Sequence, residues 1–152
     1  MAASNATKSA GTVADVNPNT IIYRPITWKD VDAVVELFDR TWPQDGALAG
    51  TRFSLLISRY FVLHYLQPTT FANAAFAADG TLAGITLIRV AGERPQFDEL
   101  GVAGDLAVTE RMIRTNPEAS KRLDMLKNAF ALELDLERES KANETTLGEL
   151  AL

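Results

Sequence analysis

The dipeptide Asp79-Gly80 constrains the fold of this chain more than any other feature of its sequence. It separates two stretches rich in strand-forming residues and alanine, at 70–78 and 81–90. Asp-Gly between two such stretches is a strong β-hairpin signal, because a two-residue type I′ turn requires positive φ at both central residues. The sequence therefore predicts an antiparallel hairpin near the middle of the chain.

One further strand and two helices are predicted before the hairpin. Residues 21–25 favour a short strand that a proline ends. Thr27 and Asp30 form a variant of the capping box, so a helix is expected to begin there and to end at Trp42, before a proline. Thr51 is expected to cap a second helix. The order strand, helix, helix, strand, strand predicts an α+β fold with a mixed or antiparallel sheet.

After the hairpin the chain is predicted to be mainly helical, and we expect a helical insertion at 91–146. Glycines and prolines break residues 91–116 into a loop and a short helical piece at 107–114. A long helix is expected over 117–141, with two apolar stripes that imply burial on both sides. One stripe contains Leu123, Leu126, Phe130 and Leu134, and the other contains Met125, Ala129, Leu132 and Leu136.

Composition excludes several kinds of function. The 152 residues suit one domain, and residues 1–20 hold so few large apolar side chains that we expect a flexible tail. Because the chain has no cysteine and one histidine, His64, no metal site is expected. A net charge of −5 argues against nucleic acid as a partner. No apolar run has the length of a membrane span and no signal pattern is present, so we expect a cytoplasmic protein without a membrane partner.

The sequence ends inside an apolar run, from Gly148 to Leu152. Chain ends are commonly polar and frayed, so this ending predicts a truncated domain. A short C-terminal strand docked on the sheet of the same chain gives the same pattern and is the open alternative.

Three segments, in this order, resemble the N-terminal half of the GNAT N-acetyltransferase family. Residues 22–30 (IYRPITWKD) lead into the amphipathic segment 34–38 (VVELF), like the first strand and helix of many members. Residues 77–85 (AADGTLAGI) resemble their second and third strands, and residues 147–152 (LGELAL) are similar to the start of their fourth. We therefore interpret 21–152 as a partial GNAT-like domain. The insertion at 91–146 departs from the family, which usually joins its third and fourth strands by a short turn.

The resemblance implies transfer of an acetyl group from acetyl-CoA to a small-molecule or peptide amine. Members of the family bind the coenzyme A pyrophosphate on backbone N–H groups of a loop Arg/Gln-x-x-Gly-x-Gly/Ala, at the N-terminus of a helix. None of the nine glycines in this chain lies in such a loop. We therefore expect acetyl-CoA to be the co-substrate of a longer parent protein, and expect this chain alone to be inactive and not to bind acetyl-CoA tightly.

The same resemblance gives four candidate site residues. Glu149 lies where the family often has an acidic residue on its fourth strand, which makes it the candidate general base. Trp42, Phe53 and Tyr60 flank the loop between the first two helices, a region that shapes the acceptor pocket in the family. The alternative interpretations are a solvent-facing strand glutamate and three aromatic residues packed in the core.

A second function, from a different class, is also open. The doubly apolar helix 117–141 is typical of a non-enzymatic dimerisation or partner-binding module. Together with the apolar end of the chain, it predicts association of the chain with itself or with a missing C-terminal segment. Within this helix the acidic residues Glu133, Asp135, Glu137 and Glu139 are interpreted as a solvated face, and some of them are expected to pair with neighbours because they oppose the helix dipole.

Overall fold

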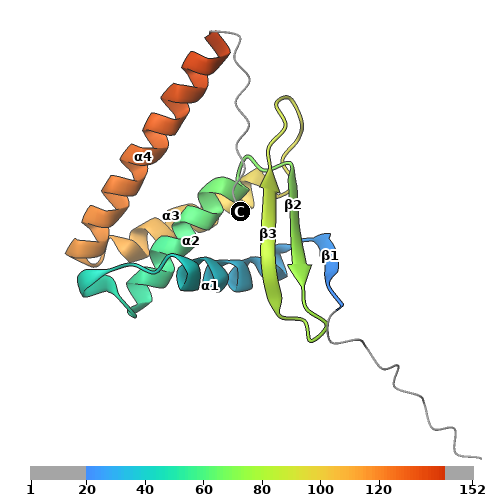
Figure 1. Cartoon of the computed structure of the whole chain (residues 1–152). Coiled ribbons are helices and arrows are strands. Elements are labelled where there is room, and N and C mark those ends of the chain that lie inside the picture. Colours follow the sequence, from blue (N-terminus) through green and yellow to red (C-terminus); the bar gives the residue numbers. More distant parts are fainter. Residues whose placement is uncertain (1–19, 143–152) are drawn as a thin grey trace, which may run out of the picture.

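A computed structural model describes residues 20–142 of the chain, and within them three strands and four α-helices make up an α+β fold (Figure 1). The strands form one antiparallel sheet in the order β1-β2-β3. This confirms the fold class predicted from the sequence. The strands are β1 (Ile22–Pro25), β2 (Phe71–Phe76) and β3 (Leu82–Ile88); the helices are α1 (Val31–Thr41), α2 (Arg52–Leu66), α3 (Glu99–Ile113) and α4 (Pro117–Ala142), with the 3-10 turns η1 (Trp28–Asp30) and η2 (Gly46–Leu48).

Polar side chains fix the connection from β1 into α1 at the capping box predicted from the sequence. The Asp30 carboxylate accepts hydrogen bonds from the Thr27 backbone N–H at 2.8 Å and from the Thr27 hydroxyl at 3.0 Å. Arg24, on β1, donates to both Asp30 oxygens at 2.8 Å. The hydrogen bonds from the Arg24 guanidinium are the main cause that holds the pKa of Asp30 well below its usual range.

The hairpin at Asp79-Gly80 is present, but its turn differs from the expected two-residue type I′ turn. The Gly80 N–H donates to the Ala77 carbonyl at 2.9 Å, and the Ala77 N–H donates to the Thr81 carbonyl at 2.8 Å, which encloses a three-residue loop. Gly80 has a φ of +85°, in the region that favours glycine. A turn closed by a glycine in this conformation forms a bulge beside the last strand pair, and it satisfies the strand twist as a type I′ turn does.

Two apolar cores share α2. The first lies between the inner face of the sheet and helices α1 and α2, and the second lies between α2, α3 and α4. The first includes Val31, Val34, Leu63, Leu66, Ala72 and Leu87. The second includes Leu48, Ile57, Tyr60, Ile113, Leu123 and Phe130. Because α2 contributes to both, it positions the sheet relative to α4.

Polar contacts also join α2 to its neighbours. Asp39, on α1, accepts hydrogen bonds from two buried hydroxyls of α2, at 2.6 Å from Ser54 and 2.8 Å from Ser58. Arg59, on α2, pairs with Asp32 of α1 at 2.6 Å and with Asp105 of α3 at 2.5 Å. These bonds fix the spacing of α1, α2 and α3 in addition to the apolar contacts.

The structure corrects the prediction of a short helical piece at 107–114. Helix α3 begins at Glu99, because the Asp98 carboxylate caps it by accepting from the Gly101 N–H at 2.8 Å. Gly101 and Gly104 therefore lie inside the helix, although glycine disfavours it. At Gly101 space is short, since a Cβ atom there would lie 3.2 Å from Asp98 Oδ2 and 3.5 Å from the ring of Trp28. Packing of this turn against Trp28 explains why a helix forms where the sequence suggested a loop.

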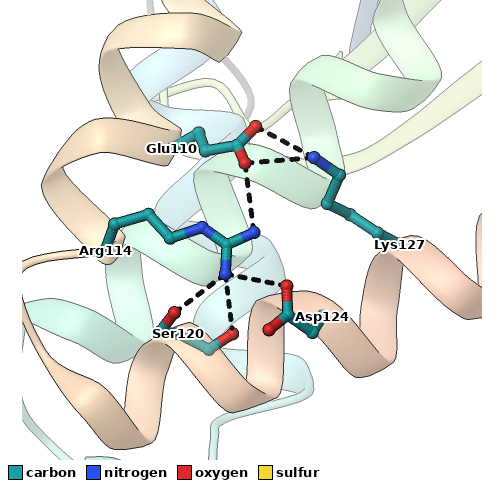
Figure 2. Close-up of polar contacts among 5 residues, drawn as sticks. All are labelled: Glu110, Arg114, Ser120, Asp124 and Lys127. Carbon is teal, nitrogen blue, oxygen red and sulfur yellow. Dashed lines mark hydrogen bonds and ion pairs between the residues drawn. The ribbon is translucent and has the colours of Figure 1, made fainter.

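A network of charged residues holds the first half of α4 against α3 (Figure 2). Glu110, on α3, accepts from the Lys127 ammonium at 3.0 and 3.2 Å and from Arg114 at 3.2 Å. Arg114 also pairs with Asp124 at 2.7 Å and donates to the Ser120 hydroxyl at 2.8 Å. These bonds set the angle at which α4 leaves the body of the protein.

The predicted helix at 117–141 is confirmed, but the prediction that both of its stripes are buried is wrong. Leu123 and Phe130 of the first stripe are buried, whereas Leu134 at its end is exposed. The second stripe faces outward, with Met125, Leu132 and Leu136 exposed to 63%, 66% and 60%. We call Met125, Ala129, Leu132 and Leu136 the outer stripe.

Some predictions fall outside the described residues. These are residues 1–19 of the tail predicted at 1–20, the apolar end at 147–152, and Glu149. Across residues 20–142, no helix combines the length and the apolar character that crossing a membrane requires.

Candidate functional site

An apolar groove of about 810 Å³ lies between α1, α2, β3 and the first half of α4. We call it the apolar groove. Among the described residues that line it, Arg122 is the one with a charged side chain, and that guanidinium pairs with Asp45. Its apolar walls include the side chains of Val34, Phe38, Trp42, Phe61, Ile85 and Leu126. A hollow of this size with apolar walls is typical of a site for a small organic ligand.

Stacked aromatic rings form one wall of the apolar groove. Phe38 of α1 lies 5.0 Å from Trp42, the residue that follows this helix, and 4.4 Å from Phe61 of α2. Phe61 lies in turn 4.7 Å from Tyr65 and 5.8 Å from Phe130 of α4. Because each ring contacts the next, the wall is fixed by packing between three helices rather than by a mobile loop.

Four polar side chains lie in this otherwise apolar lining, namely Arg122, Tyr65, Thr41 and Gln44. The Thr41 hydroxyl donates to the Leu37 carbonyl of the same helix at 2.8 Å. The side-chain oxygen of Gln44 is buried, and it accepts no hydrogen bond from any residue in the described part of the chain. Buried acceptors normally have a donor. The Gln44 oxygen is thus an unpaired acceptor beside the groove, but it has no surface accessible to a ligand in this conformation.

A second hollow, of about 880 Å³, lies at the other side of the aromatic wall, beside the end of β3. We call it the acidic cleft. Four glutamates line it, against two basic residues: Glu93, Glu99, Glu133 and Glu137, with Arg89 and Lys141. Arg89 pairs with Glu137 at 2.6 Å, which joins the end of β3 to the second half of α4. The excess of carboxylates makes this hollow attractive to cations rather than to anions.

His64 lies in the wall of the acidic cleft. Its ring stacks on Phe130 at 3.6 Å with an angle of 5° between the planes, and Tyr65 meets it edge-on at 5.1 Å. Burial lowers the pKa of His64, and the nearby Glu133 carboxylate opposes this shift. Glu133 also accepts from the Tyr65 hydroxyl, at 2.8 and 2.9 Å to its two oxygens. The His64 imidazole is therefore packed as a ring against Phe130 and Tyr65.

The structure separates the three aromatic residues predicted to share a site. Trp42 lies at the apolar groove and is half exposed. Tyr60 is buried in the core between α2, α3 and α4, and burial raises the pKa of its hydroxyl. Phe53 packs against that same core. The fourth candidate, Glu149, lies outside the described residues.

Apart from Trp42, the sequence analysis did not identify the residues that line the apolar groove. Phe38 and Phe61 are each one helical turn from another aromatic residue, Trp42 and Tyr65, so aromatic pairs at this spacing were the available signal. No signal in the sequence indicates that Ile85 of β3 and Leu126 of α4 line the same groove. In the part of the chain that the structure describes, no three His, Asp or Glu side chains are grouped as a metal site requires.

The chain matches no protein-family model, and comparison with curated proteins and with solved structures gave no match.

Proposed function

We propose that this chain is the acceptor-binding part of an amine N-acyltransferase of the GNAT type. The apolar groove receives the apolar body of the amine. The observation that carries this proposal is the arrangement of β1, α1, α2, β2 and β3, in which the strands form an antiparallel sheet in chain order and both helices pack on one face of it.

The resemblance and the groove support each other through α1 and α2. In the family that the sequence resembles, the region between the first two helices shapes the acceptor pocket. Here the C-terminal end of α1 supplies Trp42 and the following loop supplies Gln44, and both line the apolar groove. The same groove borders β3, next to which the family places the fourth strand that binds the pantetheine arm. An amine in the groove would therefore lie near the thioester.

The lining of the groove narrows the class of acceptor. Polyamines and aminoglycosides carry several positive charges and need carboxylates around them. Of the described residues lining the apolar groove, none is acidic, and the one charged side chain, Arg122, is positive. Such a lining suits a primary amine on an aromatic or aliphatic body.

The reaction that this proposal implies is direct aminolysis of a thioester. The lone pair of the neutral amine attacks the acetyl carbonyl, the carbon–sulfur bond breaks, and coenzyme A leaves as a thiolate. A base removes the extra proton from the amine nitrogen, and Glu149 is the candidate for that role. The chain contributes the orientation of the amine in the groove. Because none of its glycines forms a pyrophosphate-binding loop, we expect no turnover by these 152 residues alone.

The test is amine-dependent release of thiol from acetyl-CoA by the product of the complete reading frame that contains this chain. Phenethylamine is expected to be a better acceptor than spermidine. Trp42→Ala is expected to raise KM for phenethylamine about tenfold, equivalent to about 1.4 kcal/mol, with little change in kcat. Tyr23→Ala is the control, because Tyr23 lies on the sheet, is exposed and does not line the groove.

Two results would count against the proposal. Absence of amine-dependent thiol release by that product would overturn the acyltransferase function. A preference for spermidine, with a KM unaffected by Trp42→Ala, would leave acyl transfer intact and overturn the role of the apolar groove.

A second candidate function is a module that associates through the long helix. The exposed outer stripe of α4 favours it, because three large apolar side chains on one face of a helix are unusual on a surface that remains in water.

A further inference from the structure

The outer stripe of α4 has the spacing of a coiled-coil seam. Met125, Ala129, Leu132 and Leu136 follow one another at intervals of four, three and four residues. This alternation keeps them on one side of a helix that packs along a second helix. All four are exposed, and the opposite side of α4 faces the body of the protein through Leu123 and Phe130. In Figure 1, α4 forms the outer edge of the molecule over its whole length.

Residues of opposite charge flank the stripe. Arg122 lies three residues before Met125, and Glu139 lies three residues after Leu136, so both continue the same seam. The positive residue is at the N-terminal end and the negative residue is at the C-terminal end. A parallel pairing of two such helices would place each residue beside its own copy, with like charges together at both ends. An antiparallel pairing places Arg122 of each copy beside Glu139 of the other.

We propose that the outer stripe binds the outer stripe of a second copy of this chain, with the two α4 helices antiparallel around a two-fold axis. The axis passes between residues 130 and 131. In this register Met125 of one copy packs on Leu136 of the other, and Ala129 packs on Leu132. Each small residue therefore faces a large one, which fills the seam without overlap. The same two-fold axis produces two Arg122–Glu139 pairs, one at each end.

The attachment of α4 to its own chain leaves the outer stripe exposed, with Met125 also bordering the apolar groove and Leu136 the acidic cleft. Lys127 of α4 pairs with Glu110 of α3, and Glu137 of α4 pairs with Arg89 at the end of β3. None of these four residues belongs to the outer stripe. Arg122 pairs with Asp45 of its own chain, and its side chain is still 38% exposed. It can therefore also approach a carboxylate of a second copy. This inference deepens the second candidate function and does not depend on acyl transfer.

The experiment is sedimentation analysis of the 152-residue chain over a broad concentration series. We expect a mass approaching twice the 16.6 kDa of one chain as the concentration rises. Leu132→Glu, at the centre of the stripe, is expected to give the monomer, with an unchanged circular dichroism spectrum because Leu132 contacts no core. Arg138→Glu, on another side of α4, is the charge-reversal control and is expected to leave the mass of the dimer unchanged.

Charge exchange tests the direction of the pairing. Glu139→Arg places two positive charges together at each end and is expected to weaken the dimer. The double variant Arg122→Glu with Glu139→Arg exchanges the charges and is expected to restore it. A monomer at all concentrations, or a dimer that Leu132→Glu leaves intact, would overturn the proposed interface. A dimer that Glu139→Arg weakens and the double variant does not restore would overturn the antiparallel register.

Discussion

Removal of the Asp39 carboxylate is expected to be one of the most destabilising single changes at the α1–α2 contact. Asp39 accepts from Ser54 at 2.6 Å and from Ser58 at 2.8 Å, and both hydroxyls are almost fully buried. A hydrogen bond to a charged group contributes about 1.5–3 kcal/mol. Each freed serine hydroxyl can rotate toward a backbone carbonyl of its own helix, which recovers part of the loss. We therefore expect Asp39→Ala to lower the free energy of unfolding by about 2–4 kcal/mol.

Equilibrium urea denaturation measures this effect, and two further variants separate its cause. Asp32→Ala is the matched control: it is the same substitution on the same helix, but the Asp32 carboxylate is 82% exposed beside Arg59. The loss there should stay below about 1 kcal/mol. Replacing Ser58 and Asp39 together by alanine removes one buried hydroxyl and keeps Ser54, which also accepts from the Gln44 N–H at 3.2 Å, so this variant should be more stable than Asp39→Ala alone. If the double variant is the less stable of the two, or if Asp39→Ala costs no more than Asp32→Ala, the reasoning is refuted.

Three other predictions concern the helices. Folding lowers the pKa of His64, so the unfolded chain takes up a proton at a higher pH than the folded chain. The free energy of unfolding, measured by urea denaturation at each pH, should therefore fall as the pH decreases from about 7 through the unfolded pKa of about 6.5. His64→Leu should abolish this dependence of stability on pH. A slope that persists in the variant would contradict this. Gly104→Ala should raise the free energy of unfolding by about 0.5–1 kcal/mol, because nothing obstructs a Cβ atom at that position. Gly101→Ala should give no gain in stability, because its Cβ atom would contact Asp98. Equal gains for the two variants in thermal denaturation would contradict the packing at Gly101. Phe130→Ala removes a buried ring that contacts α2, and it should lower the free energy of unfolding by about 3–5 kcal/mol in the same assay. A loss under about 1 kcal/mol, as at an exposed site, would show that α4 is not packed on α2.

Local signals in the sequence were enough to predict most elements of the fold. The capping residues Thr27 and Thr51 begin helices where predicted, and the strands on both sides of Asp79-Gly80 pair as a hairpin. Each of these features depends on hydrogen bonds between residues close in sequence. The length of α3 did not follow in this way, because Gly101 is accommodated through contacts with Trp28, more than 70 residues earlier.

The candidate site was less predictable than the fold. Trp42 was singled out because it lies beside the loop between two helices, and the structure places it at the apolar groove. Phe53 and Tyr60 have the same kind of position in the sequence, yet the turn of α2 directs them to the core shared with α3 and α4. The helical spacing alone did not decide which apolar stripe of α4 packs inward, since both stripes repeat with the same period. Long-range contacts determine which stripe faces inward: Leu123 and Phe130 pack in the core shared with α2 and α3, and ion pairs join α4 to α3 and to the end of β3.

The claim that the apolar groove receives an apolar amine is tested most directly by amide and methyl NMR of this chain during titration with phenethylamine. The predicted result is a saturable set of chemical-shift changes confined to Val34, Phe61, Ile85 and Leu126, moved to about tenfold higher phenethylamine concentration by Trp42→Ala and not produced by spermidine. Shift changes centred on His64 and Glu133 in the acidic cleft, or no saturable change at all, would contradict it.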